Sequence, residues 1–410
     1  FIYNLDDSVT MNSISNYPIK STQAPITMSR ELSQGAYLTN AQMQLKWKEE
    51  GMKMSIKDFA IKAIQNGETK YTAVDGTPAL KKAIIAKFKR ENNLDYNSNQ
   101  ISVSTGAKQV IYNALIATIN PLDEVIIPAP YWVSYPDMVL LAGGVPVIAQ
   151  SSSENNFKIT AHELKSKITS KTKWLILNSP SNPTGACYNQ DELQSLVEVL
   201  IENPHVYILT DDIYEHLIFD DLQFYTLPQI APQLKDRCLV VNGVSKAYAM
   251  TGWRIGYGAG PEKLIKAMSM IQSQSTSSPS SISQAASVEA LNGNQDYIQQ
   301  GKKIFQERRN LVVSMLNKIE GIECNQPNGA FYVFPSCKKL LGKKAVISGV
   351  EQIIKDDNDF ATYLLEEALV AVVPGVAFGA SGFFRISYAA SEDFLKDSMS
   401  RIAKACEKLK

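Results

Sequence analysis

Short apolar stretches alternate along this chain with polar or glycine-rich segments. Between five of these stretches, apolar residues recur with helical spacing, for example at residues 109–119 and 189–201. A regular alternation of strands and helices is typical of an α/β fold, so we predict a mostly parallel mixed sheet flanked by helices. The five predicted strands lie in the segments ISVSTGAK from Ile101, EVIIPAPYW from Glu124, KWLILNSPSNPTG from Lys173, VYILTDDIY from Val206 and CLVVNGVSK from Cys238.

Each of the five predicted strands is followed directly by a short run of polar or glycine residues. In open α/β sheets the ligand crevice lies beyond the carboxyl ends of the strands. A single polar strand end is usually only a turn. Five of them at corresponding positions predict one site assembled from many segments of the chain.

The later part of the chain has a different pattern. Residues 281–319 read mostly as helix with a break near Asn292, and short strand-like stretches and a terminal helix follow. This mixed pattern is typical of a smaller α+β domain. We therefore predict a large domain at residues 55–300 and a small domain built from both ends of the chain, residues 1–54 and 301–410.

Composition narrows the possible functions. The 410 residues carry 41 Lys+Arg and 41 Asp+Glu, so a formal net charge of +0 favours neither nucleic acid nor a membrane as partner. Five well-separated cysteines without a CxxC pair, and only three histidines, argue against a disulfide framework and against a metal site. No apolar run is long enough to cross a membrane, and the start of the chain lacks the basic pattern of a signal peptide. We expect a cytoplasmic protein.

Lys246 lies in a glycine- and serine-rich turn directly after an apolar run, in the stretch VVNGVSKAYAMTGWRIGYG. Taken alone, it reads as an ordinary surface lysine. If the crevice desolvates it, its neutral amine becomes available as a nucleophile toward a carbonyl. A Schiff base to an aldehyde cofactor, pyridoxal 5′-phosphate, is the use that the neighbouring segments favour.

The other strand ends offer the groups that such a cofactor needs. The phosphate calls for backbone N–H groups at a helix start and for a guanidinium. The pyridine nitrogen calls for a buried carboxylate, for which we prefer Asp211 over its neighbour Asp212 because alternate residues of a strand point apart. Ring-oxygen donors and a stacking aromatic complete the set. The candidates are Gly106, Ala107, Lys108, Ser245 and Arg254 for the phosphate, Asp211 for the nitrogen, Tyr214 and Asn182 for the ring oxygen, and Trp132 for the ring face.

Each of these assignments also has an ordinary structural explanation. Trp132 fits a plain core aromatic, Asn182 before Pro183 fits a turn, and Asp211 fits a helix N-cap. Spacing alone does not decide between these alternatives and the cofactor site.

Five motifs in the same order resemble the aspartate aminotransferase family of fold type I pyridoxal phosphate enzymes, in its bacterial-type class I subgroup. They are KYTAVDGTPALKKAI, PYWVSYP, NSPSNPTG, DDIYEHL and SKAYAMTGWRIGYGAGP, and the resemblance runs from about Ser55 to Lys410. It implies that Lys246 forms the Schiff base and that Asp211, Tyr214, Asn182 and Trp132 contact the cofactor ring. It implies further that Tyr71 reaches the phosphate in the partner subunit of a homodimer with shared active sites. Arg385 would bind the substrate α-carboxylate, and Lys108 the distal carboxylate.

The activity implied by the resemblance is a ping-pong transfer of an amino group. L-Aspartate or glutamate is the expected donor, and 2-oxoglutarate or oxaloacetate the expected acceptor. Prephenate and aromatic amino acids are alternatives, because the segment that selects the substrate falls in the first 50 or so residues, which match poorly. An inactive relative that only binds cofactor is another. A nucleotide-binding protein would carry a Walker-type or GxGxxG turn, and STGAKQ is neither.

One family feature is missing. Relatives carry a glycine-rich segment that closes over the substrate, whereas this sequence passes from Met54 to Ser55 without it. The alternatives are a true deletion of about a dozen residues, which puts catalysis in doubt, and a mobile loop that was left out of the chain. We expect the second.

Overall fold

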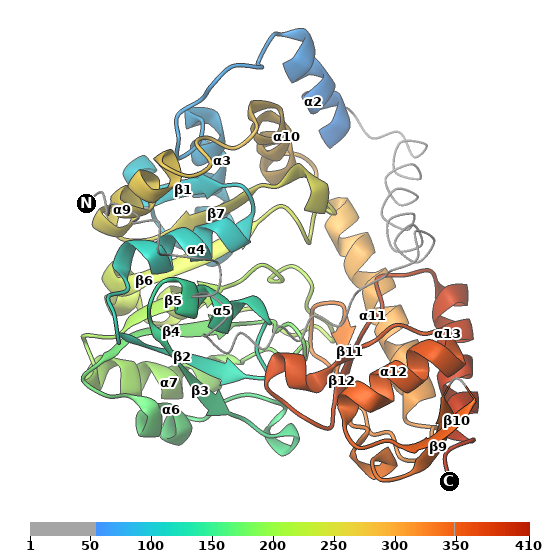
Figure 1. The fold of residues 1–410 in the computed structure, drawn as a ribbon. Coiled ribbons are helices and arrows are strands. Elements are labelled where there is room, and N and C mark those ends of the chain that lie inside the picture. Colours follow the sequence, from blue (N-terminus) through green and yellow to red (C-terminus); the bar gives the residue numbers. More distant parts are fainter. Residues whose placement is uncertain (1–54, 348) are drawn as a thin grey trace, which may run out of the picture.

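A seven-stranded mixed sheet forms the larger part of the structure (Figure 1). The computed structural model describes residues 55–347 and 349–410. The sheet has the order β1-β7-β6-β5-β4-β2-β3, and β7 alone pairs antiparallel with its neighbours, so the predicted α/β fold with a mostly parallel sheet is confirmed. All five predicted strands are present. The strands are β1 (Ile101–Ser104), β2 (Glu124–Ala129), β3 (Val145–Gln150), β4 (Thr172–Asn178), β5 (Tyr207–Asp211), β6 (Cys238–Gly243) and β7 (Gly256–Ala259).

Helices cover both faces of this sheet because successive strand residues point to opposite sides. Ile176 packs into the cluster under α4, α5 and α9, whereas its neighbours Leu175 and Leu177 pack into the cluster on the other face. Both faces are therefore apolar. The helices are α3 (Pro78–Asn92), α4 (Ala107–Thr118), α5 (Ser134–Leu141), α6 (Ala161–Lys167), α7 (Gln190–Glu202), α8 (Leu227–Ile230), α9 (Glu262–Ser273) and α10 (Ser281–Asn292), with α2 (Ile56–Gln65) against α10.

Local sequence explains where several helices begin. Thr77 caps α3 before Pro78, and Asn189 forms a capping box with Glu192 at the start of α7. Helix α4 differs, since its N-cap is Gly106 and no side chain accepts from its first amides. The start of α4 is thus left available for an anion.

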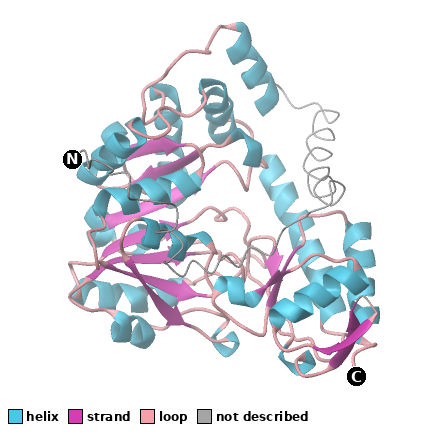
Figure 2. Cartoon of the chain, viewed as in Figure 1, coloured by secondary structure: helices cyan, strands magenta, loops and turns pink. Residues whose placement is uncertain are grey.

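The later part of the chain forms a smaller α+β unit around its own apolar cluster, beside the large sheet (Figure 2). A long helix leads into it from the large sheet, and the predicted limit between residues 300 and 301 falls inside that helix. The elements are α11 (Asp296–Leu316), β8 (Tyr332–Val333), β9 (Lys344–Ile347), β10 (Val350–Ile353), α12 (Asp357–Ala368), β11 (Val373–Pro374), β12 (Phe384–Ser387) and α13 (Glu392–Cys406).

Residues 1–54, expected to contribute to the small domain, lie outside the described residues. The full 410-residue sequence joins Met54 directly to Ser55. The sequence is therefore continuous at this point, and the glycine-rich segment expected from the resemblance is absent from it. Among residues 55–347 and 349–410, no helix combines the length and the apolarity that crossing a membrane requires.

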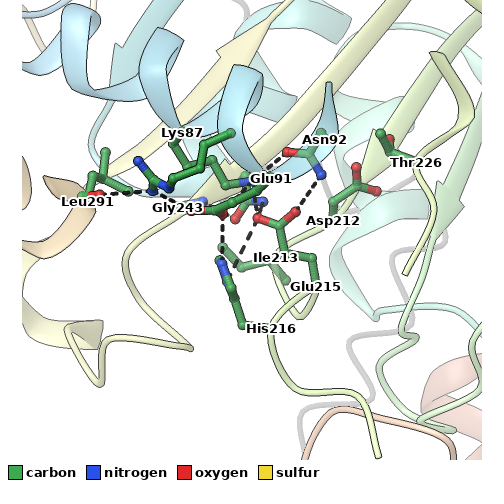
Figure 3. Close-up of polar contacts among 12 residues, drawn as sticks. Lys87, Glu91, Asn92, Asp212, Ile213, Glu215, His216, Thr226, Gly243 and Leu291 are labelled. Carbon is green, nitrogen blue, oxygen red and sulfur yellow. Dashed lines mark hydrogen bonds and ion pairs between the residues drawn. The ribbon is translucent and has the colours of Figure 1, made fainter. Parts of the chain in front are cut away.

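A buried charge network ties helix α3 to the turn that follows β5 (Figure 3). Lys87 of α3 is fully buried and forms an ion pair with Glu215, which is also buried. Its ammonium also lies 3.5 Å from the carboxylate of Glu91, which contacts His216 at 2.9 Å. Asn242, at the end of β6, donates to Glu215 over 2.7 Å. One carboxylate thus joins the ends of two neighbouring strands to a helix.

The network keeps its acids charged despite burial. Burial alone raises the pKa of a carboxyl group, but Lys87 and His216 outweigh it and lower the pKa of Glu215 below its ordinary value. The pKa of Glu91 falls to about 2, since the hydrogen bond from His216 and the charge of Lys87 overcome the same penalty. Because Lys87 is the buried counterion, its removal leaves an uncompensated charge.

We expect Lys87→Met to lower the free energy of unfolding by about 3–5 kcal/mol, because Glu215 would stay buried without its cation. The double variant Lys87→Met/Glu215→Gln should recover most of that loss, since it removes both charges. Urea unfolding of the single and double variants measures the effect. A double variant as unstable as Lys87→Met would contradict the assignment of the cost to the unpaired charge.

Candidate active site

The polar ends of the five predicted strands meet around one cavity of about 240 Å³. It opens at the carboxyl edge of the sheet, where the strand order predicts a ligand crevice. Every one of the five predicted segments contributes residues to its wall. The lining residues are Ala107, Lys108, Trp132, Tyr135, Asn178, Asn182, Asp211, Ile213, Tyr214, Ser245, Lys246, Thr251 and Arg254.

Lys246 lies in the turn that follows β6 and lines this cavity in a half-buried position. Its Nζ lies 5.7 Å from the ring centre of Tyr214 and 5.5 Å from that of Phe331. The interpretation as an ordinary surface lysine is therefore wrong. An amine held between aromatic rings at a cavity wall is available to react with a ligand carbonyl.

Asp211 ends β5 with its side chain buried beneath the cavity. Tyr135 donates to its Oδ2 over 2.7 Å, and the backbone N–H of Ile213 contacts Oδ1 at 3.4 Å. Burial raises the pKa of Asp211 to about 6, although the Tyr135 hydrogen bond and the charge of Lys246 oppose this. Asp212 does not line the cavity and instead contacts Thr210 at 3.4 Å, as the strand alternation predicts.

The start of α4 and Arg254 form a cationic corner of the cavity. Arg254 has a left-handed backbone (φ 57°) and donates to the carbonyls of Thr251 and Thr105 over 2.9 and 3.3 Å. A Cβ at Gly106 would lie 2.1 Å from Arg254 Nη2, so only glycine lets the guanidinium reach the helix start. The corner offers backbone amides and a fixed cation to one anion.

Lys108 and Trp132 form the outer wall of the cavity. The ammonium of Lys108 lies 4.8 Å from the ring centre of Trp132, a cation–π contact. Burial and then the nearby Arg254 lower the pKa of Lys108, against an opposing effect of Asp137. Trp132 is half-buried and lines the cavity, so it is not a plain core aromatic.

Arg385 of β12 connects the smaller unit to the cavity wall at Asn182. Its Nη1 donates to Asn182 Oδ1 over 2.8 Å, and its guanidinium lies 4.6 Å from the ring centre of Tyr332. The hydroxyls of Tyr332 and Tyr214 are 3.0 Å apart. Burial and this contact raise the pKa of Tyr214, which therefore stays a neutral donor. Ser245 is buried at the wall beside Lys246.

Three predicted site residues do not line the cavity: Gly106 and Arg385 lie next to residues that do, whereas Tyr71 lies apart from it. Its side chain is 91% exposed and lines a second hollow, which Phe59 of α2 and Val288 of α10 also line. Within one chain it therefore contributes nothing to the cavity around Lys246.

Four residues that line the cavity, Ile213 among them, and the neighbouring Tyr332 are absent from the sequence-based prediction. Tyr135 and Asn178 lie inside the motifs PYWVSYP and NSPSNPTG. Their closeness in sequence to Trp132 and Asn182 could have predicted them as site residues. Thr251 lies between Lys246 and Arg254 and was equally within reach. Tyr332 meets Tyr214 across 118 residues of sequence, and no local pattern indicates that contact.

Comparison with known proteins gives consistent results. The family described as Aminotransferase class I and II matches residues 30–402. A Rickettsia bellii protein named "Probable aspartate/prephenate aminotransferase" is 60% identical over 355 residues, which are 87% of this chain and 88% of that protein. The "Aspartate aminotransferase" of Rhizobium meliloti is 56% identical over 86% of each chain. A crystal structure of the Rhizobium meliloti aspartate aminotransferase has a TM-score of 0.84 at 51% identity, covering 94% of this chain and 98% of its own.

The fold and the cavity thus define an α/β enzyme of the aminotransferase type. Because the family match spans most of the sequence, the chain belongs to the aminotransferase class I and II family.

We expect Asp211→Asn to stabilise the cofactor-free protein above pH 6, by up to about 3 kcal/mol for a shift from 3.8 to about 6. An acid with a raised pKa in the folded state favours folding only at low pH, and this contribution disappears as pH rises from 4 to 6. Asp211→Asn cannot ionise, so its free energy of unfolding should lack this decrease between pH 4 and pH 6. Urea unfolding at pH 4 and at pH 8 checks it, and equal stability of both proteins at pH 8 would contradict the expectation.

Proposed function

We propose that this protein is a pyridoxal 5′-phosphate-dependent aminotransferase with a ping-pong reaction. L-Aspartate or glutamate is the donor, and 2-oxoglutarate or oxaloacetate the acceptor. The observation that carries the proposal is the presence, in one cavity, of an amine, a buried carboxylate and a cationic anion-binding corner, namely Lys246, Asp211 and the start of α4 with Arg254. Family membership supports the same reaction class.

The residues present fit this cofactor. The corner at Gly106 and Arg254 would hold a phosphate, and its glycine is required by the 2.1 Å approach of the guanidinium. The raised pKa of Asp211 reflects a carboxylate that lacks a full cationic partner, which a protonated pyridine nitrogen would supply. Trp132 would lie against the ring face, and Tyr214 and Asn182 would donate to the ring oxygen.

When bound, the cofactor supplies an electron sink for the bond broken at the substrate Cα. Lys246 holds the reactive amine at the cavity wall and would move the proton at Cα, first as base and then as acid. Asp211 would stay ionised beside a cation, because a neighbouring positive charge lowers the pKa of a carboxyl group. Ser245 and Arg254 would fix the phosphate end, so that the reacting carbon stays next to Lys246.

Two cations would select a dicarboxylic substrate. Arg385 is oriented by Asn182 and would bind the α-carboxylate through a bidentate contact. Lys108, at the outer wall, would bind the distal carboxylate. This charge arrangement favours aspartate and glutamate over neutral amino acids.

Prephenate is a second candidate acceptor. It is also a 2-oxo acid with a second carboxylate, and relatives with 60% identity are named as probable aspartate/prephenate aminotransferases. Parallel assays with 2-oxoglutarate, prephenate and phenylpyruvate as acceptors separate these cases. The absence of the expected glycine-rich segment before Ser55 keeps the inactive relative as the competing proposal, which predicts cofactor binding without amino transfer.

We further propose a homodimer with shared active sites. The support is that Tyr71 is 91% exposed and stands beside a hollow of about 420 Å³, while Ile61 and Ile64 of the neighbouring α2 are also exposed. A second copy of the chain would cover these residues and would receive Tyr71 at its phosphate corner. The five cysteines are all free, which favours a reducing compartment such as the cytoplasm.

We expect Lys246→Ala to abolish measurable turnover of aspartate with 2-oxoglutarate, because no other group lies in its position, while part of the cofactor binding remains. Lys266→Ala, on the exposed side of α9, is the matched control and should keep wild-type turnover. A coupled assay of oxaloacetate formation measures both. Full activity of Lys246→Ala would end the proposal.

Arg385→Lys should lower kcat/KM for aspartate about 100-fold, because an ammonium cannot form the bidentate contact with a carboxylate. The loss should fall mainly on KM if the contact acts equally before and in the transition state. Cofactor absorbance should stay unchanged. Equal losses for Arg385→Lys with carboxylate and carboxamide substrates would contradict the assigned role.

A further inference from the structure

The loop at residues 68–77 carries Tyr71 and is fixed at several points by hydrogen bonds to α9, α10 and β1. Ser281 of α10 donates to the carbonyl of Glu68 over 2.6 Å. The backbone N–H of Val103 in β1 donates to the carbonyl of Asp75 over 2.9 Å. The exposed Tyr71 side chain is not held by packing, so its direction depends on these backbone anchors.

Gln284 of α10 is the anchor nearest to Tyr71. Its side chain is fully buried, and its Oε1 accepts from the backbone N–H of Thr77 over 2.8 Å. Its Nε2 donates to Thr72 Oγ1 over 3.1 Å and to the carbonyl of Pro279 over 2.9 Å. One amide therefore joins the residue after Tyr71 to the far end of the same loop. None of its partners lines the cavity around Lys246.

A second buried glutamine, Gln272 of α9, makes a different set of contacts. Its Nε2 donates to the carbonyls of Val74 and Val103 over 2.6 and 2.8 Å. Its Oε1 accepts from Ser104, at the end of β1, directly before the anion-binding corner. Gln272 thus links the Tyr71 loop to the phosphate corner of its own chain, whereas Gln284 links the loop to Pro279 and, among the described residues, forms no hydrogen bond with that corner.

We propose that Gln284 is a positioning residue for the active site of the partner subunit. It holds the Thr72 side chain and the Thr77 backbone, which both follow Tyr71 in the loop, and thereby aims an exposed side chain at the phosphate corner of a second copy. This inference rests on the proposed homodimer with shared sites. It assigns to Gln284 an effect on the other chain's site, which distinguishes it from a residue that only stabilises its own fold.

The role of Gln284 can be tested in a hybrid dimer, in which one chain carries Gln284→Met and the other carries Lys246→Ala. In a hybrid of Gln284→Met and Lys246→Ala chains, the site that keeps Lys246 receives Tyr71 from a chain with intact Gln284. We expect the Gln284→Met homodimer to bind pyridoxal 5′-phosphate about tenfold more weakly than wild type, as for the loss of one or two hydrogen bonds. The Lys246 site of the hybrid should regain wild-type affinity and wild-type turnover per site.

Three further variants make the comparison specific. Tyr71→Phe is the positive control, since its defect should also be repaired in the hybrid. Gln272→Met is the matched buried glutamine, and its defect should persist because it contacts the corner of its own chain. Thr72→Val removes only the hydroxyl that accepts from Gln284, and it should reproduce a smaller form of the Gln284→Met effect if that variant fails to fold.

The readouts are the cofactor dissociation constant from absorbance titration and kcat per Lys246 site, on hybrids purified through two different tags. Repair of Gln284→Met and Tyr71→Phe, but not of Gln272→Met, supports the proposal. A Gln284→Met defect that persists in the hybrid overturns it, as does a Tyr71→Phe defect that persists. A wild-type protein that binds cofactor without amino transfer would overturn the proposed function instead, and the affinity comparison would still decide the role of Gln284.

Discussion

The buried carboxylate of Asp211 is the constraint on which the site depends. It ends the central strand of the sheet, where burial disfavours its charge, and among the described residues its side chain accepts hydrogen bonds from a tyrosine hydroxyl and a backbone amide. A carboxylate kept in this condition costs folding stability, and such costs are typical of functional sites. The surrounding residues are arranged so that a cation arriving in the cavity would relieve that cost, and this is the property that a pyridinium needs from its partner.

The rest of the fold places charged groups around the Asp211 carboxylate, but none of the ion pairs in the described part of the chain neutralises it. Behind the strand ends, Lys87 pairs with Glu215 and so fixes the turn that follows Asp211 and carries Tyr214. In front of them, Arg254 and the uncapped start of α4 gather positive potential at one corner. Glu215, a buried acid paired with Lys87, helps to hold the scaffold together, whereas Asp211, which forms no ion pair with any described residue, faces the cavity.

Much of this site could be predicted from the sequence because its residues follow strand ends, and strand ends of a parallel sheet share one edge. The convergence of Lys108, Trp132, Asn182, Asp211 and Lys246 is of this kind. Two strands of the seven-stranded sheet were not predicted, since β7 is the glycine-rich GYGA and β3 contains Pro146. The contact of Tyr214 with Tyr332 depends on the docking of the smaller unit, which no local pattern encodes. The position of Tyr71 outside the cavity became visible only in three dimensions, and its suggested role rests on the resemblance to relatives.

The most direct test of the central claim is the absorption spectrum of the purified, cofactor-loaded protein on addition of L-aspartate alone and then of 2-oxoglutarate. The account predicts that aspartate converts the bound cofactor from its aldehyde form to its amine form without turnover, and that the oxo acid restores the original band. This outcome would demonstrate both half-reactions in a site that contains Lys246 and Asp211. A loaded protein whose spectrum ignores aspartate, glutamate and aromatic amino acids alike would contradict it, and would identify the chain as a cofactor-binding relative that has lost the reaction.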